Sequence, residues 1–393
     1  MSEDSFTEVT NQSWFSRIGG AIKGIIFGLI LFIGAFPLLF WNEGRAVKTY
    51  KTLKEGGGAV VSVRADRVDS ANAEKLIHLT GRATTEDILT DQIFSVSANA
   101  LKLRRNVEMY QWQESSRSET KKKLGGGTET VTEYSYSKEW SDDAVSSANF
   151  KKPSGHENPG SMPYESTVLT ADKVTLGAFT LSPSLVGKID DFASLVVGMD
   201  SPLPAELEGR AISHNGGFYL GADPISPQVG DIRINFSTVS PTDVSVIAKQ
   251  VGDSFEAYRA KAGGEIELLQ TGVHTADAMI QKAQTDNKIM TWILRFVGFI
   301  LMLIGLNMVF KVLSVIADVL PILGSIVGAG TGMIAFLLSA LLSLITIAIA
   351  WIVFRPLLGI ILLAIAVGLT VLIMNRLKAG KNKAMPPPLP PGA

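Results

Sequence analysis

The sequence of 393 residues contains no cysteine. This absence excludes disulfide bonds, zinc sites built on thiolates and a cysteine nucleophile, and it leaves the redox compartment undetermined. Histidine is also scarce, and the four histidines are scattered without the spacing of metal ligands: His78, His156, His214 and His274. We therefore expect no metal, no cofactor and no catalytic residue.

The sequence also lacks an excess of charge, because 36 basic and 37 acidic residues give a formal net charge of −1. Such a chain has no global field to attract nucleic acid, so a nucleic-acid partner is not expected. Only 19% of the residues are charged, whereas 46% are hydrophobic. The apolar residues are concentrated near the N-terminus and in the last quarter, which indicates a membrane protein with a globular part.

Four apolar segments are long enough to cross a bilayer. The first covers residues 18–41 and lies between Trp14 and Trp41, where interfacial aromatic residues are expected. The other three cover residues 289–311, 320–352 and 356–374. With an N-terminal tail at 1–17 and a basic, proline-rich tail at 375–393, they predict a multi-pass α-helical membrane protein with four spans.

Residues 42–288 have the alternating pattern of strands and predict a large, inserted, β-rich α+β domain outside the membrane. In residues 231–237, Ile232, Ile234 and Phe236 should line one buried face. Residues 107–112 predict a central strand buried on both faces, with Tyr110 and Trp112 in the core. A hairpin is expected at 244–258, a strand at 265–270, and a helix at 275–290 that continues into the second span.

Two local motifs carry no chemistry that we can assign. His156-Glu157 begins like a zinc-protease helix, but Pro159 would break that helix and Gly160 stands where the second histidine belongs. Gly125–Gly127 beside Lys121–Lys123 predicts an exposed hairpin tip, and we favour a solvated loop over a binding patch.

Glycines recur at four-residue spacing in the first span, at Gly20, Gly24 and Gly28, and in the third, at Gly324, Gly328 and Gly332. Such rows let helices approach closely in lipid. We favour packing within one chain, with oligomer contacts as the alternative. The polar residues at membrane depth are Arg295, Asn307, Asp318 and Arg355; all except Asn307 lie near span ends, so we interpret them as snorkelling side chains.

Several blocks of the sequence, taken in order, resemble the LUMA family of membrane proteins, also called transmembrane protein 43. The blocks cover nearly the whole chain, and the most specific is residues 107–112. The residues that carry the resemblance are Asn42, Glu43, Gly44, Arg45, Arg104, Arg105, Glu108, Tyr110, Trp112, His156, Asn158, Pro159, Asp231, Arg355 and Pro356.

The resemblance implies a four-span protein of the endoplasmic reticulum and nuclear inner membrane, with its large domain in the lumen. It also implies self-association and an organising role among envelope proteins such as lamins and emerin, and it supplies no catalytic residues. The glycine insertions at 56–58 and 125–127, the proline-rich tail and the missing cysteines indicate a bacterial member. For a bacterial member, lamin and emerin cannot be transferred as partners, the membrane would be the plasma (inner) membrane, and the lumen would correspond to the periplasm or exterior.

Charge alone leaves the orientation open. Arg376, Lys378, Lys381 and Lys383 favour cytoplasmic termini, whereas the basic residues that follow the first span favour a cytosolic domain: Arg45, Lys48, Lys51 and Lys54. With the resemblance, we predict that both termini face the cytoplasm and that residues 42–288 lie outside it.

Three functions remain in view. The first is a non-enzymatic scaffold that forms a homo-oligomer and organises membrane proteins or lipid. The alternative is a channel or transporter subunit, although only Asn307 is clearly placed in the middle of a span. The third is a surface enzyme, for which Glu108, His156 and Glu165 are the only loosely plausible members of a site.

Overall fold

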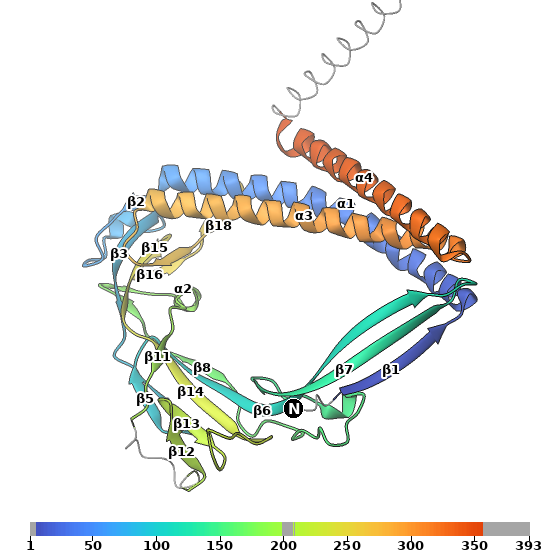
Figure 1. Ribbon diagram of the computed structural model, residues 1–393. Helices are drawn as coiled ribbons and strands as arrows, with labels where there is room; N and C mark the ends of the chain where they lie inside the picture. The colour runs from blue at the N-terminus through green and yellow to red at the C-terminus, as the bar shows by residue number, and fades with distance from the viewer. Residues whose placement is uncertain (1–4, 199–206, 208, 357–393) are drawn as a thin grey trace, which may run out of the picture. The chain divides into compact units, whose positions relative to one another are not determined.

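The computed structural model describes residues 5–198, 207 and 209–356 (Figure 1). The chain folds as two compact units. We call Phe15–Tyr50 with Asp286–Ala393 the membrane unit, and Met1–Trp14 with Lys51–Thr285 the domain unit. Each unit is therefore built from segments that are far apart in the sequence.

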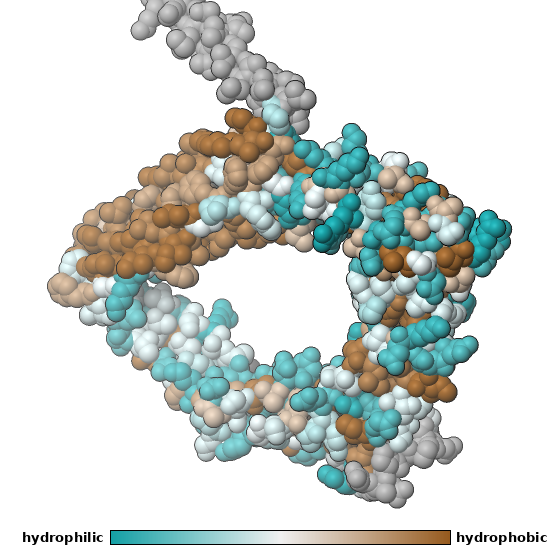
Figure 2. Space-filling view, turned by 180° about the vertical axis from the view of Figure 1, so that it is seen from behind, coloured by the Kyte–Doolittle hydropathy of each residue, from teal (hydrophilic) through white to brown (hydrophobic). Residues whose placement is uncertain are grey.

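Three helices of the described chain are long and apolar enough to cross a membrane: α1 (Trp14–Ala59), α3 (Ala276–Ala317) and α4 (Pro321–Phe354). Thr275 caps α3, because its Oγ1 accepts a hydrogen bond of 3.2 Å from the backbone N–H of Ala278. Pro321 begins α4, at the position where its missing N–H costs nothing. Figure 2 shows the apolar side chains gathered over these helices.

The described helices confirm a membrane protein with a large β-rich domain, and three of the expected spans fall within them. The helices extend beyond the apolar runs, and the stalk expected at 275–290 is indeed the first part of α3. The fourth span, expected at 356–374, lies outside the described residues apart from Pro356, and so does the tail at 375–393.

The larger sheet of the domain unit has the order β1-β7-β6-β14-β13-β12, and every pair in it is antiparallel. Strand β8 (Thr167–Thr170) also pairs with β6, and β11 (Ala193–Leu195) with β14. The strands in the main order are β1 (Ser5–Gln12), β6 (Lys102–Lys122), β7 (Thr128–Ser141), β12 (Ala211–His214), β13 (Gly217–Leu220) and β14 (Ile232–Val239).

The second sheet has the order β10-β9-β3-β15-β16, with β19 on β15 and β2 parallel to β3. Its strands are β2 (Val61–Ser62), β3 (Leu76–Thr84), β9 (Thr175–Leu176), β10 (Phe179–Thr180), β15 (Thr242–Val251), β16 (Ser254–Glu256) and β19 (Leu268–Thr271). Two short pairs complete the unit: β4 (Ile88–Asp91) with β5 (Val96–Asn99), and β17 (Tyr258–Arg259) with β18 (Glu265–Ile266).

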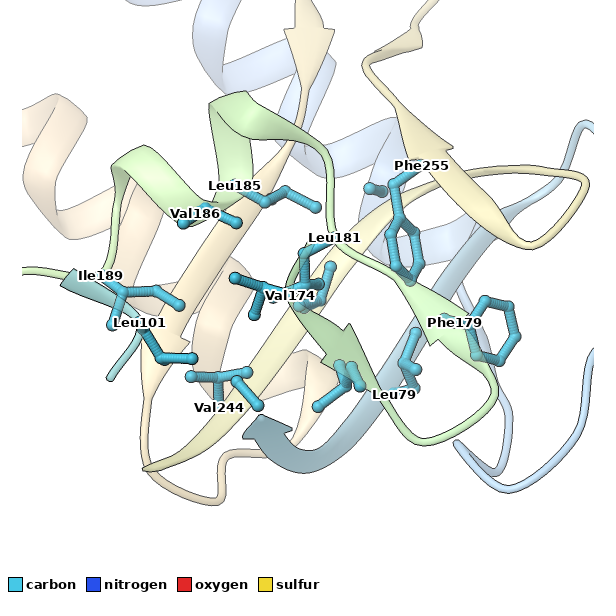
Figure 3. Packing of buried hydrophobic residues seen from close by; sticks show 14 of the residues in the cluster. Leu79, Leu101, Val174, Phe179, Leu181, Leu185, Val186, Ile189, Val244 and Phe255 are labelled. Carbon is cyan, nitrogen blue, oxygen red and sulfur yellow. The ribbon is translucent and has the colours of Figure 1, made fainter. Parts of the chain in front are cut away.

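The main core of the domain unit lies on the second sheet, beneath the short helix α2 (Pro183–Gly187). Leu185 and Val186 of α2 pack toward Val244 and Leu101, while Phe179 stacks on Phe255 with ring centroids 5.4 Å apart (Figure 3). The α2 helix begins after Ser182, whose hydroxyl accepts a hydrogen bond from the Leu185 N–H. Capping fixes this short helix where its two apolar residues close the core.

Most expectations for individual strands are confirmed. Ile232, Ile234 and Phe236 are buried on one face of β14, and the expected hairpin is formed by β15 and β16. Strand β6 is central, because it pairs with both β7 and β14. Burial of β6 on both faces is wrong, however: Tyr110 and Trp112 are only half-buried, Tyr110 beside the Trp140 ring and Trp112 beside His156 and Lys138.

The N-terminal segment, expected to be a tail, contains a strand of the domain unit. Residues of β1 pair with β7 from Ser5↔Ser135 to Gln12↔Thr128. Because β1 and β7 are hydrogen-bonded within the domain unit, residues 5–12 belong to its larger sheet. No periodic apolar face in residues 5–12 signals the strand, because both faces are largely exposed.

The helix α1 continues well past Trp41 and includes the three consecutive glycines of the insertion at 56–58. Leu53 is buried in a cluster with Ile266 and Ile280. A Cβ added at Gly56 would overlap Ile266 and lie 3.3 Å from Leu76 Cδ2. Packing against the second sheet therefore stabilises a helical turn that glycine alone disfavours.

A buried polar junction in the membrane unit

The block Asn42–Arg45 on α1 forms a polar junction with α3 and α4, and its centre is the Glu43 carboxylate. Arg295 donates two hydrogen bonds to this group, from Nε to Oε1 at 2.6 Å and from a terminal nitrogen to Oε2 at 3.0 Å. Trp351 Nε1 on α4 donates a third, at 2.8 Å. Glu43 is completely buried, and the Arg295 side chain is 13% exposed.

The rest of the junction joins α1 to α3. Asn42 Nδ2 donates to the Thr291 carbonyl at 3.0 Å, and Arg45 donates to Asn287 Oδ1 at 3.1 Å and to Thr291 Oγ1 at 3.2 Å. Asn287 Nδ2 in turn donates to the Ala46 carbonyl at 3.0 Å. A buried polar group without a partner is costly, so these bonds strongly favour one register between the two helices.

Gly44 allows the end of α4 to approach this block. A Cβ added at Gly44 would lie 2.7 Å from the Phe354 ring, and that ring packs on Phe40 with centroids 5.0 Å apart. The Arg355 guanidinium lies 5.8 Å from the Trp351 ring centroid, and Pro356 follows as the last described residue. The end of α4 at Phe354 thus meets Gly44, and Arg355 and Pro356 follow Phe354 directly in the sequence.

A second buried ion pair joins Arg17 of α1 to Asp318, just after α3, at 2.5 Å. The snorkelling interpretation is therefore wrong for Arg295 and Asp318, because both are paired inside the unit. Arg17 and Glu43 are separated by about 39 Å along a helix that rises about 1.5 Å per residue. The two buried ion pairs therefore lie near opposite ends of the apolar part of α1.

The two glycine rows face α3 to different degrees. In α1, a Cβ at Gly28 would lie 2.8 Å from the Gly305 carbonyl oxygen, a Cβ at Gly24 would lie 3.6 Å from Met308, and Gly20 has no such neighbour within 4 Å. In α4, Gly324 adjoins Asp318, Gly328 adjoins Ser314 and Gly332 adjoins Asn307. Both rows therefore contain contacts within one chain, and Gly20 lies on an open face.

The remaining residues of the family motif hold β6 in the domain unit. Glu108 and Arg233 form a bidentate ion pair between β6 and β14, at 2.6 and 2.8 Å. Arg105 is buried against Asp91 at 2.6 Å, and the Arg104 guanidinium lies 3.5 Å from the Phe192 ring centroid. These contacts stabilise the sheet and leave none of the three charged motif residues of β6 in an open cleft.

A second group of motif residues surrounds Trp112. Asn158 Oδ1 accepts from the Trp112 N–H at 2.7 Å, and Asn158 Nδ2 donates to the Trp112 carbonyl at 2.9 Å. His156 is completely buried and stacks on Tyr136, with centroids 3.9 Å apart. Pro159 lies beside Gly230, and the neighbouring Asp231 accepts a hydrogen bond of 2.5 Å from Tyr219. Burial is the largest cause of the raised pKa of Tyr219, and the hydrogen bond to Asp231 is the second largest.

A pocket of about 580 Å³ in the domain unit is lined by Ser62, His78, Thr80 and His274 among others. His78 Nε2 lies 2.9 Å from the His274 carbonyl, which can only accept, so Nδ1 is left to accept from Ser62 Oγ at 3.2 Å. Burial lowers the pKa of His78 and favours this neutral form. Both ring nitrogens of His78 are thus engaged, one by the His274 carbonyl and one by the Ser62 hydroxyl.

The described residues include no group of three or more His, Asp or Glu side chains that could hold a metal ion. Two of the candidate residues for an enzyme site have separate structural roles, because Glu108 pairs with Arg233 while His156 packs between aromatic rings. In the sequence, Glu43 stands out only as a residue of the family motif and Arg295 only as a polar residue at membrane depth. Their contact cannot be read from the sequence, because they are 252 residues apart.

Fold and junction together define a class: a membrane protein in which apolar helices carry an inserted, two-sheet β-rich domain. The family model for transmembrane protein 43 matches residues 109–356. The chain is 35% identical to mouse transmembrane protein 43, with 97% of both chains covered, and 34% identical to the human protein, with 95% and 94% covered. The chain belongs to the transmembrane protein 43 family.

A more distant relative is the transmembrane protein 43 homolog of Drosophila melanogaster, which is 31% identical over 86% of this chain and 90% of its own. No solved structure matches the chain.

Proposed function

We propose that this protein is a non-enzymatic membrane scaffold that self-associates and organises proteins or lipids around it. The observation that carries the proposal is that buried charges and exposed apolar side chains occupy different places in the membrane unit. Its two buried carboxylates, Glu43 and Asp318, are paired with arginines inside the unit, while many large apolar side chains of its helices are exposed. Such a unit is suited to hold its own form and to offer its surface to lipid or to other helices.

The α1 helix offers the clearest surface for self-association. Ile26 is 68% exposed and Ile30 is 61% exposed, and Gly20 has open space where a side chain would be. A second copy could pack closely against this face, because glycine permits backbone to meet backbone.

The alternative, a channel or transporter subunit, needs polar groups along a path through the bundle. Asn307 was the one residue expected in the middle of a span, and its Nδ2 donates to the Leu303 carbonyl of its own helix at 2.9 Å. This bond supports the scaffold over the channel.

For the location we propose the plasma (inner) membrane of a bacterium, with the large domain extracytoplasmic. In a eukaryotic cell the equivalent would be the endoplasmic reticulum and nuclear inner membrane.

The test uses single cysteines, which the cysteine-free chain permits. Ile26→Cys in native membranes should form a disulfide-linked dimer under mild oxidation, whereas Ala35→Cys, at a position with no exposure, should not. Mass measurement of the purified chain in mild detergent should show multimers with bound protein or lipid. A monomer without bound protein or lipid would contradict the scaffold, and ion flux through reconstituted vesicles would favour the channel.

A further inference from the structure

The tip of the β6–β7 hairpin rests on a tryptophan at the start of a membrane helix. The tip turns through Gly125 and Gly126, which have φ angles of +85° and +82°, and Lys123 N–H donates to the Gly127 carbonyl at 2.8 Å. A Cβ added at Gly126 would lie 2.7 Å from Trp14 Cγ and 3.0 Å from Nε1. Glycine is therefore required here both for the backbone conformation and for the contact with the indole.

Strand β1 fixes this contact from the other side. Its last residue, Gln12, pairs with Thr128, the first residue of β7, so Trp14 follows directly beside the tip. Lys123 Nζ also donates to Asn11 Oδ1 at 2.9 Å. The tip, β1 and Trp14 all belong to the domain unit, and their placement relative to one another is set within it.

Trp14 is the first residue of α1, and the apolar run of that helix begins at Ile18. An indole has an apolar body with one N–H donor and is enriched where hydrocarbon meets headgroups. The tip therefore contacts a residue type that is suited to the boundary between hydrocarbon and headgroups.

The residues of the tip are of the types expected at a bilayer surface. Leu124 is 82% exposed, and three lysines precede it. Lys121 pairs with Glu119 at 3.3 Å, with both side chains at least 70% exposed, so this pair is weak and exchangeable. Lysine stems can lie along an apolar boundary while their ammonium groups reach lipid phosphates.

We propose that the hairpin tip Lys121–Gly127, supported by Trp14, docks on anionic lipid headgroups of the bilayer that α1 enters. Leu124 enters the boundary between headgroups and acyl chains, and Lys121 and Lys122 contact phosphates, while Lys123 stays paired with Glu129 at 2.6 Å. This replaces the solvated loop that the sequence favours. The signal missing from the sequence is the contact between Gly126 and Trp14, which are 112 residues apart.

The experiment places an environment-sensitive fluorophore on Leu124→Cys in the full-length protein, in nanodiscs of phosphatidylcholine with or without phosphatidylglycerol. Nitroxide groups on the lipid headgroups should quench this label and its emission should shift to the blue, more so with phosphatidylglycerol. Ile225→Cys is the matched control, because Ile225 is 89% exposed in the loop between β13 and β14. That loop meets β6 near Met109, about 40 Å along the strand from the tip at about 3.3 Å per residue.

Two variants separate the parts of the proposal. Lys121→Glu with Lys122→Glu should reduce quenching at position 124 at least twofold in the anionic discs, and Trp14→Ala should reduce it in both lipids. An unchanged melting temperature would show that the fold survives these changes. If the label emits as in water and is not quenched in either lipid, the proposal is overturned. If the label is quenched to the same extent with and without phosphatidylglycerol and in the lysine variant, the role of anionic headgroups is overturned.

Discussion

At the scale of single residues, the Glu43 carboxylate decides how the membrane helices meet, because it receives donors from both α3 and α4. Removing one partner of a buried ion pair leaves the other charge without compensation, at a cost of about 3–5 kcal/mol. We predict that Glu43→Gln lowers the free energy of unfolding by about this amount. Thermal unfolding of the full-length protein in detergent, followed by tryptophan fluorescence, measures the change.

The matched control is Asp66→Asn, which breaks the Arg64–Asp66 pair, whose side chains are 81% and 54% exposed. An exposed pair contributes at most about 1 kcal/mol, so this change should be small. Adding Arg295→Met to Glu43→Gln should restore much of the lost stability, since no charge then remains buried. Equal effects of Glu43→Gln and Asp66→Asn would show that the junction does not hold the helices.

At the scale of elements, the pairing of β1 with β7 is the contact to test, because the whole of α1 lies in the sequence between β1 and the rest of its sheet. Val9 and Val131 are direct partners across β1 and β7, and opposed Cβ atoms in such a pair are about 4.5–5.5 Å apart. We predict that Val9→Cys with Val131→Cys forms a disulfide in native membranes under mild oxidation. Gel mobility before and after reduction reports it.

Val9→Cys with Ser254→Cys, on β16 of the other sheet, is the control that should stay reduced. The disulfide would show that β1 and the domain share a compartment; α1 would then have both ends on one side and would enter the bilayer without crossing it. Absence of the disulfide, together with labelling of Val9→Cys from the opposite side, would contradict the pairing and restore the orientation expected from the sequence.

At the scale of the whole molecule, the question is whether the glycine row of α4 serves the single chain or an assembly. A Cβ at Gly328 would lie 2.9 Å from Ser314 Oγ on α3, whereas Gly330 has no neighbour within 4 Å of its Cβ position. We predict that Gly328→Leu separates α3 from α4 and lowers the melting temperature, while Gly330→Leu leaves it unchanged. Crosslinking in the same samples reports the oligomers.

Loss of oligomers with unchanged melting in Gly328→Leu would contradict the contact within the chain and place the row between protomers. Leu362, in the expected fourth span, could serve as a comparison, but it lies outside the described residues. Gly330 is the better control, because it is on the same helix and differs from Gly328 only in what faces it.

The sequence by itself determined the features that depend on local periodicity. Apolar runs predicted the membrane helices, and alternation predicted β14, the β15–β16 hairpin and the central place of β6, because the burial of one face leaves its period in the sequence. The family motif was also visible, since its residues stand in ordered blocks. Their roles were not, because Glu43, Arg105 and Glu108 each acquire a partner only through folding.

Only the tertiary structure decided the features that depend on partners distant in the sequence. Gly56–Gly58 are helical because Ile266 and Ile280 pack against that turn, and His156 is a core residue because Tyr136 and Trp112 enclose it. Strand β1 has no apolar face of its own and exists through its hydrogen bonds to β7. The junction at Glu43 has the same origin: a buried charge is tolerated only where the fold brings its counter-charge, and no local pattern records where that will be.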